Sequence, residues 1–473
     1  MMDFRLRLQS KETYIDIFAY IACIVFIACG ILVSLHRYWQ YEVSFIDFGI
    51  YDQIIWKVSQ FQEPIVLHFI HGKINFLGDH VVPSIFIISP LYWLIDKPEM
   101  ILIVQSLVVG LSGILLYDLA KYVLKDHALA FSILTSYFLF TGLQNAVITE
   151  FHELTVMVLP FMAALWAIVK NKKVLYYILL IITLGFKEIT CSLGIGLGIA
   201  LIFLKREWIR TGIFTLIISL LWGFIAFKII IPYFSQGQYL YASSIPDGLF
   251  NKIYALVDHP LKRRTLFYSF LSFSYLSFFA PQFWLAILQD YTSRFLPQHF
   301  ITRWDLGLHY NAQSAVWLSV ASVFGLKRLL NFKVIKQYKN LIALFIILNS
   351  FILFRFVLHG PFLLAINPSF YNQTKKFDFL NTMVKTIPPD SFVMTHNNLA
   401  TRFTHQEVAL LTPEYEKSKP DYILLDLREG QSPNNFCCNG NLEIARNIYQ
   451  ELILDERYVL TYQTKEQFIF KRK

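Results

Sequence analysis

Charged residues are scarce in this sequence. Only 16% of its 473 residues are charged, against about 25% in an average soluble domain, whereas 55% are hydrophobic. This composition excludes a disordered protein, which combines low hydrophobicity with high net charge. Five cysteines in a chain of this length also exclude a small disulfide-stabilised domain. Because apolar runs of about 20 residues recur, we expect an all-α polytopic membrane protein.

The motifs of common soluble enzymes are missing as well. The sequence has no P-loop, no His-Glu-x-x-His and no Cys/His spacing typical of a zinc site. The Gly194-x-Gly196-x-Gly198 motif follows no predicted strand, so we interpret it as close helix packing. Cys437 and Cys438 are adjacent, and a disulfide between them would be strained.

The basic surplus is confined to the apolar part of the chain. Residues 360–473 carry 13 basic and 13 acidic residues, which leaves 29 basic and 20 acidic residues for positions 1–359. A basic surplus in short loops between apolar runs marks cytoplasmic loops and does not indicate a nucleic-acid surface. We therefore predict a multi-pass plasma (inner) membrane protein whose N-terminus, with Arg5 and Arg7, is cytoplasmic.

The apolar runs predict a bundle of roughly ten to twelve spans within residues 1–359, with a long first outer loop at 36–82. The segment 83–95 contains two prolines and is short for a span, and residues 232–312 are difficult to assign, so the count stays approximate. The clear runs are 15–35, 100–120, 128–148, 154–169, 174–186, 189–204, 211–231, 314–326 and 341–358.

Residues 360–473 predict a small α/β domain on the extracytoplasmic side. Short alternating runs at 391–395, 421–426 and 467–471 are typical of strands. An amphipathic pattern over 441–454 predicts a helix.

Most other ionisable residues that can be placed gather on the predicted outer face. Charges at membrane depth are costly and mark functional candidates. Two structural interpretations stay open: Asp47 capping a helix over 48–58, and Lys187 with Glu188 orienting two half-helices. The candidates are Asp47, Asp52, Asp79, His80, His152, Glu153, Lys187, Glu188, His309 and Tyr310.

Such a face suits chemistry on a lipid-linked substrate. A phosphate would meet cationic side chains, and a carboxylate would deprotonate an acceptor hydroxyl. The candidate cations are Lys187, Arg263, Arg264 and Arg303. A transporter or flippase for lipid-linked substrates would also use buried charges, although the sequence has no internal repeat. A non-catalytic envelope protein is a further alternative.

The polar motifs occur in the same order in one prokaryotic family of predicted polytopic membrane proteins with a domain of unknown function. The chain resembles this family over roughly residues 14–470, and the family is grouped distantly with the GT-C glycosyltransferases. The motifs are Phe45-x-Asp47-x-Gly49-x-x-Asp52-Gln53-x-x-Trp56, His80-x-x-Pro83, Pro90-Leu91-Tyr92, Phe151-His152-Glu153, Lys187-Glu188 and His309-Tyr310.

The resemblance implies a GT-C-like helical core and an inverting glycosyltransferase that uses a polyprenyl-phosphate sugar donor and an extracytoplasmic acceptor. It implies that Asp47 is the first-loop acid, with Asp52 as second choice, and we expect Asp47 to activate the acceptor hydroxyl. From its charge at the outer end of an apolar run, we expect Lys187 to contact the donor phosphate. Some GT-C enzymes need a divalent metal, so Mg or Mn is an expected cofactor. Its candidate ligands are Asp47, Asp52 and Asp79. We expect Asp52, His80, His152 and Glu153 to act in catalysis with Asp47. We expect Asp79, Lys187, Glu188, His309 and Tyr310 to bind the substrate.

Overall fold

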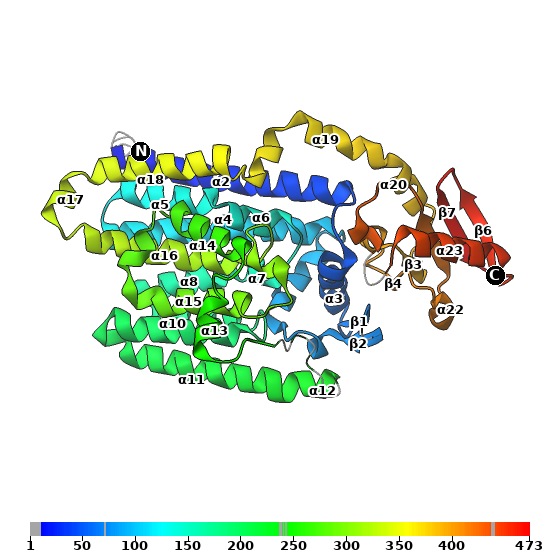
Figure 1. Cartoon of the computed structure of the whole chain (residues 1–473), viewed down its shortest axis with the longest axis horizontal. Helices are drawn as coiled ribbons and strands as arrows, with labels where there is room; N and C mark the ends of the chain where they lie inside the picture. The colour runs from blue at the N-terminus through cyan, green and yellow to red at the C-terminus, as the bar shows by residue number, and fades with distance from the viewer. Residues whose placement is uncertain (1–10, 71, 236–238, 240, 242–243, 437–439) are drawn as a thin grey trace. The chain divides into compact units, whose positions relative to one another are not determined.

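The computed structural model describes residues 11–70, 72–235, 239, 241, 244–436 and 440–473. It divides into two compact units, drawn together in Figure 1. Unit 1 comprises the chain up to Val33, Asp79–Ile85 and Ile103–Ile366; unit 2 comprises Ser34–Gly78, Phe86–Leu102 and Asn367–Lys473. These divisions differ from the predicted domains 1–359 and 360–473, because the first loop groups with the C-terminal residues. Cys437 and Cys438 lie outside the described residues.

Four helical segments of the described chain are long and apolar enough to cross a membrane. They are Glu12–Trp39, Glu99–Leu124, Arg206–Ser235 and Lys339–Val357. A fifth span is possible if α5 (His127–Leu139) and α6 (Thr141–Ile148), which are bent by 50° at their junction, cross together. The predicted ten to twelve spans are therefore not confirmed, although the mainly helical, membrane-type architecture is.

Several predicted spans are short helices. The helix α9 (Lys173–Leu184) has 12 residues and α10 (Thr190–Leu204) has 15, so they extend about 18 and 23 Å. A hydrocarbon core is about 30 Å thick. The helices α7 (Glu153–Val156) and α8 (Val158–Val169) together form a third short apolar segment. The break between α9 and α10 contains Lys187 and Glu188, and α7 begins at Glu153, directly after His152.

Close backbone contact joins α10 to α11 (Ile209–Ile225), which lie side by side in Figure 1. A Cβ atom added at Gly198 would lie 2.9 Å from the Gly212 carbonyl oxygen, and one added at Gly212 would lie 2.6 Å from that of Gly198. This confirms the interpretation of the glycine motif as helix packing.

Large apolar side chains cover the outward faces of α11 and α18 (Lys339–Ile352). Phe214, Phe224 and Phe345, for example, are each more than half exposed. Such a surface suits contact with lipid. By contrast, α16 (Asn311–Leu329) is buried along almost its whole length, and many of its buried residues are alanine and serine.

Unit 1 also contains several shorter elements, which connect the helices described above. They are α12 (Ile231–Ser235), α13 (Leu249–Tyr254), α14 (Pro260–Ser272), α15 (Trp284–Phe295), α17 (Lys333–Gln337) and the turns η4 (Arg206–Trp208), η5 (Ala226–Ile230), η6 (Leu276–Phe279), η7 (Pro281–Phe283), η8 (Ile301–Trp304), η9 (Leu353–Val357) and η10 (Pro361–Ile366). The helices α2 (Lys11–Trp39) and α4 (Glu99–Leu124) each contribute residues to both units.

The C-terminal part of unit 2 contains a five-stranded mixed sheet in the order β4-β3-β5-β7-β6. The central strand β5 (Tyr422–Asp426) is parallel to β3 (Val393–Thr395) and antiparallel to β7 (Gln467–Arg472). The outer strands are β4 (Val408–Leu410) and β6 (Tyr458–Gln463). The helix α23 (Leu442–Leu454) buries its apolar stripe in the same core. A small C-terminal sheet domain, predicted as an α/β domain for residues 360–473, is therefore present.

The first loop supplies the other elements of unit 2. A turn of π-helix, η1 (Phe45–Gly49), leads into α3 (Ile50–Ser59), and a hairpin of β1 (Ile65–His68) and β2 (Gly72–Asn75) follows. The remaining elements are η2 (Phe76–Gly78), η3 (Pro83–Trp93), α19 (Pro368–Thr374), η11 (Lys375–Phe377), α20 (Asp378–Val384), α21 (Asn397–Ala400), α22 (Tyr415–Ser418) and η12 (Pro433–Phe436).

Candidate functional site

Glu188, in the loop between α9 and α10, is a buried carboxylate that contacts three polar groups. The imidazole Nδ1 of His80 lies 3.0 Å from its Oε1, which also accepts a hydrogen bond from the Tyr239 hydroxyl. The backbone N–H of Val81 donates to Oε2. Burial would raise the pKa of Glu188, but His80 and Lys187 lower it to about 2. The loop carboxylate is therefore a fixed anion.

Lys187 forms an ion pair with a different residue. Its Nζ lies 2.6 Å from Oε1 of Glu153, at the start of α7. The Lys187 carbonyl accepts a hydrogen bond from the Trp222 indole. The other carboxylate oxygen of Glu153 is buried and has no hydrogen-bond partner among the described residues. Lys187 and Glu188 thus connect separate elements, which differs from the simple pair that would orient two half-helices.

Two histidines complete this group. The rings of His152 and His309 stack with centroids 3.5 Å apart, and the His152 backbone N–H donates to the Gln105 side chain. Burial lowers the pKa of His309 well below its usual value, and nearby His152, Lys187 and Arg303 act in the same direction. His309 is therefore a neutral imidazole. We call His80, His152, Glu153, Lys187, Glu188 and His309 the polar cluster.

Arg303, in η8, is a cation beside the polar cluster. Its guanidinium lies 4.0 Å from the Phe300 ring centroid and 5.7 Å from that of Tyr310. Its positive charge lowers the pKa of His309. Across the part of the chain that the structure describes, no carboxylate lies within ion-pair distance of Arg303, and its Nε finds no acceptor. An anionic ligand group would neutralise it.

Asp79 joins the polar cluster through its neighbour. Its Oδ2 lies 3.9 Å from Nε2 of His80 and accepts a hydrogen bond from the Tyr241 hydroxyl. Tyr241 also stacks on the His80 ring. The residues of unit 1 named from the sequence are therefore brought together from four separate stretches of chain: Asp79, His80, His152, Glu153, Lys187, Glu188, His309 and Tyr310.

Asp52 belongs to unit 2, where it is fully buried in α3. The hydroxyls of Tyr92 and Thr404 donate to its two oxygens, and Nε2 of His405 lies 3.3 Å from Oδ2. His405 also contacts Asp96 at 2.8 Å. Burial would lower the pKa of His405, but the Asp52 and Asp96 carboxylates raise it above its usual value. Asp52 thus contacts a partly buried histidine and favours its cationic form.

Asp47 also belongs to unit 2 and lies in the η1 turn with an exposed side chain. It does not cap the following helix, because Gly49 occupies the N-cap position of α3. Hydrogen bonds to the Asn397 side chain hold the turn in place. The Asn397 side-chain oxygen accepts hydrogen bonds from the backbone N–H groups of Phe45 and Ile46.

The described residues contain no group of three His, Cys, Asp or Glu side chains arranged to hold a metal ion. Both oxygens of Asp52 already accept hydrogen bonds, which leaves little room for a cation. Asp47 and Asp52 lie in unit 2 and Asp79 in unit 1, and neither unit assembles a complete ligand set. Mg or Mn binding stays a prediction, and no chemical step below depends on it.

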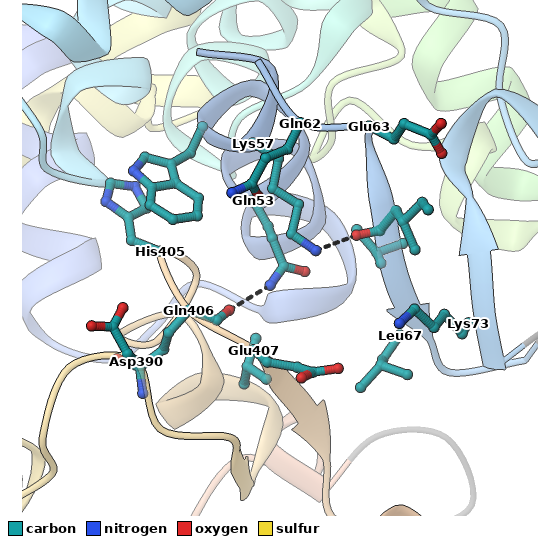
Figure 2. A pocket seen from close by; sticks show the side chains of 14 residues that line it. Gln53, Lys57, Gln62, Glu63, Leu67, Lys73, Asp390, His405, Gln406 and Glu407 are labelled. Carbon is teal, nitrogen blue, oxygen red and sulfur yellow. Dashed lines mark hydrogen bonds between the residues drawn. The ribbon is translucent and has the colours of Figure 1, made fainter. Parts of the chain in front are cut away.

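Unit 2 contains a polar cavity of about 490 Å³ (Figure 2). Gln53 donates to the Gln406 carbonyl, and the Lys57 ammonium donates to the Ile65 carbonyl. The cavity also presents charged side chains that have no ion-pair partner within the described residues. They are Lys73, Glu63, Asp390 and Glu407.

Sequence reasoning missed several partners of the predicted residues. Tyr239 and Tyr241 lie in the stretch that could not be assigned, and Tyr92 was noted only as part of a motif. His405 follows Asp52 by more than 350 residues, so no local spacing connects them. Arg303 was one of four candidate cations, and nothing in the sequence distinguished it from the others.

A solved structure shares the fold of this chain. ArnT from Cupriavidus metallidurans bound to undecaprenyl phosphate matches with a TM-score of 0.52 at 10% sequence identity, covering 98% of each chain. The apo state of that protein gives a TM-score of 0.48 at 8% identity, covering 93% of this chain and 96% of ArnT. At such identity the likeness concerns the fold.

No curated protein matches the sequence. A family model described as a predicted membrane protein, DUF2079, matches residues 37–467. This range covers both units, including the first-loop motif and the polar cluster. The chain therefore belongs to the DUF2079 family of predicted membrane proteins.

Proposed function

We propose that this chain is a membrane glycosyltransferase that transfers a sugar from a polyprenyl-phosphate donor to an extracytoplasmic acceptor. The observation that carries the proposal is the polar cluster, in which buried charges from separate segments meet between short apolar helices. The ArnT-like fold supports it, because ArnT has been solved with undecaprenyl phosphate bound. Since a fold hosts many functions, the chemistry of the cluster has to carry the argument.

The donor phosphate needs cations at the membrane boundary. Lys187 is already 2.6 Å from Glu153, whereas Arg303 has no carboxylate partner among the described residues. A guanidinium binds phosphate through paired donors, which a single ammonium does not provide. We assign Arg303 as the main phosphate contact and Lys187 as the second. His80 and Glu188 hold the loop that carries Lys187.

In this reaction the acceptor hydroxyl oxygen attacks the anomeric carbon of the donor sugar. The bond between that carbon and the phosphate oxygen breaks, and the phosphate leaves with the electron pair. Cations facing that oxygen stabilise the charge that develops on it. A carboxylate accepts the hydroxyl proton. We assign this role to Asp47, from the first-loop motif and its exposed side chain.

Replacing Arg303 tests the phosphate assignment. In Arg303→Gln, transfer from lipid-linked sugars extracted from host membranes should fall about 100-fold, as for other groups that stabilise developing charge. Mass spectrometry of the glycan product of the full-length chain in membrane vesicles measures this change. Arg263→Gln is the matched control, because Arg263 is exposed and contacts only the Val257 carbonyl through the hydrogen bond described. Equal loss in both variants contradicts the assignment.

Asp47→Asn tests the base separately. Full retention of transfer by this variant rules out Asp47 as the base. Substrate-dependent ion flux in proteoliposomes, without any glycan product, would overturn the enzyme proposal in favour of a transporter. Comparison of envelope glycans between the host and a deletion strain identifies the sugar to be supplied in these assays.

A further inference from the structure

A cavity of about 460 Å³ in unit 2, separate in its lining from the one in Figure 2, is rich in amide side chains. Amides both donate and accept hydrogen bonds, so they match ligands that carry many hydroxyl groups. The lining amides are Gln40, Asn397, Asn398, Gln431, Asn434 and Asn435. Four of them, Gln40, Asn397, Gln431 and Asn435, already form hydrogen bonds within unit 2.

Two of these amides have an unused buried oxygen. Gln40 and Asn398 are 1% and 4% exposed, and neither Gln40 Oε1 nor Asn398 Oδ1 has a hydrogen-bond partner within the described residues. The Gln40 amide nitrogen donates to the Phe370 carbonyl, which fixes its orientation. A buried acceptor without a donor is unfavourable. A ligand hydroxyl would supply the missing donor.

The charged side chains around this cavity are already neutralised. Arg37 pairs with Glu42 at 3.6 Å, and Arg428 pairs with Asp426 at 2.7 Å. Glu429 pairs with Arg446. A charged ligand would have to displace these partners, whereas an uncharged one would not. The cavity of Figure 2 differs, because its lysines and carboxylates are not paired with one another.

Aromatic rings provide the apolar part of the lining. Tyr41 and Phe377 both line the cavity, with ring centroids 6.0 Å apart. The carbon face of a sugar ring packs against such surfaces, while its hydroxyls bond to amides. The combination of aromatic rings, amides and paired charges is therefore suited to an uncharged carbohydrate.

The cavity is connected to the segment that carries Asp47. Asn397 lines it, donates to the Asn434 carbonyl, and accepts from the backbone N–H groups of Phe45 and Ile46 at 2.9 and 3.2 Å. We propose that this cavity binds an uncharged, hydroxyl-rich sugar, and that this sugar is part of the acceptor. That the sugar is part of the acceptor rests on the proposed function, whereas the binding of an uncharged sugar does not.

Binding of uncharged trisaccharides to the purified full-length chain tests the proposal. The probes are trisaccharides of glucose, mannose and N-acetylglucosamine, followed by saturation-transfer NMR and titration. At least one should bind, and glucosamine and galacturonic acid should bind more weakly. Asn398→Leu should weaken binding about tenfold, which corresponds to the loss of one or two hydrogen bonds.

Asn434→Ala is the second variant, because its side chain is exposed and the backbone oxygen that Asn397 uses is retained. It should weaken binding about threefold even if Asn398→Leu does not fold. Glu407→Gln, in the cavity of Figure 2, is the control and should bind as the unmodified chain does. Absence of binding by all three trisaccharides, or equal binding by the unmodified chain and the Asn434 variant, overturns the proposal.

The two proposals fail in different ways. If the chain binds an uncharged sugar but transfers none, the carbohydrate site stands and the glycosyltransferase proposal fails. If the chain transfers sugar and Asn398→Leu reacts and binds normally, the transfer stands and this cavity is not the acceptor site.

Discussion

At the scale of single residues, the buried carboxylate of Asp52 is satisfied by partners that lie far away in sequence. Asp52 accepts from Tyr92 and Thr404 and faces His405, all within unit 2. The sequence identified Asp52 as unusual, since a carboxylate among aromatics in a membrane-associated loop is costly. It could not identify the partners, because the contacts form only after residues 404 and 405 fold against α3. The role of Asp52 in this network is that of holding His405.

The His405 network predicts a pH-dependent stability. The pKa of His405 is raised in the folded state by Asp52 and Asp96, with Trp56 and Tyr92 as its other ring neighbours. Its stabilising contribution is fully present below the unfolded pKa of about 6.5 and is lost as the pH rises through the higher folded value. Thermal unfolding of the full chain in detergent should therefore show a falling Tm above pH 6.5.

Substituting the histidine should remove this dependence. His405→Gln should lower stability by about 2 kcal/mol at pH 6, the usual size for a hydrogen bond to a charged group, and flatten the pH profile. His299→Gln is the control, since His299 is exposed and is hydrogen-bonded to Ser244 rather than to a carboxylate. A profile that keeps its slope in His405→Gln contradicts this account.

At the scale of elements, glycine spacing determines how the helices of unit 1 pack. Gly198 on α10 and Gly212 on α11 each leave room for the other's carbonyl oxygen. This contact was predictable from the glycine motif in an apolar run, because small residues allow close backbone approach. The apolar runs at 174–186 and 189–204 were also predictable and correspond to α9 and α10, but hydropathy alone does not show whether such short runs cross the membrane.

Adding one methyl group at this crossing should destabilise the chain. In Gly212→Ala the new Cβ would lie 2.6 Å from backbone, so the helices must separate, at a cost of about 1–3 kcal/mol. The Tm in detergent measures this change. Gly307→Ala should leave the Tm unchanged, because its new Cβ would meet only Asp305 at an ordinary 3.8 Å. Equal effects of the two substitutions would show that the crossing is not the cause.

At the scale of the whole molecule, the basic surplus predicts its orientation in the membrane. Lys170, Lys172 and Lys173 join α8 to α9, and Lys327, Arg328 and Lys333 follow the core of α16. By the positive-inside tendency, we expect such loops to be cytoplasmic. The balanced residues 360–473 should then face the other side.

Cysteine labelling checks this orientation. In a chain whose five native cysteines are replaced by serine, Ser432→Cys should react with an impermeant maleimide in intact cells. Lys172→Cys should react only after the membrane is permeabilised. Both positions are exposed in the structure, so accessibility within the protein does not limit either. The reverse pattern would contradict the predicted topology.

The sequence by itself determined the membrane class and the small C-terminal sheet domain, because composition and local periodicity decide these. Its polar motifs carried the resemblance to the family. Only the tertiary structure decided which charges meet. Lys187 pairs with Glu153 and Glu188 with His80, although Lys187 and Glu188 are neighbours in sequence. Burial forces each charge to find a partner, and which partner it finds depends on how the helices around it end and turn.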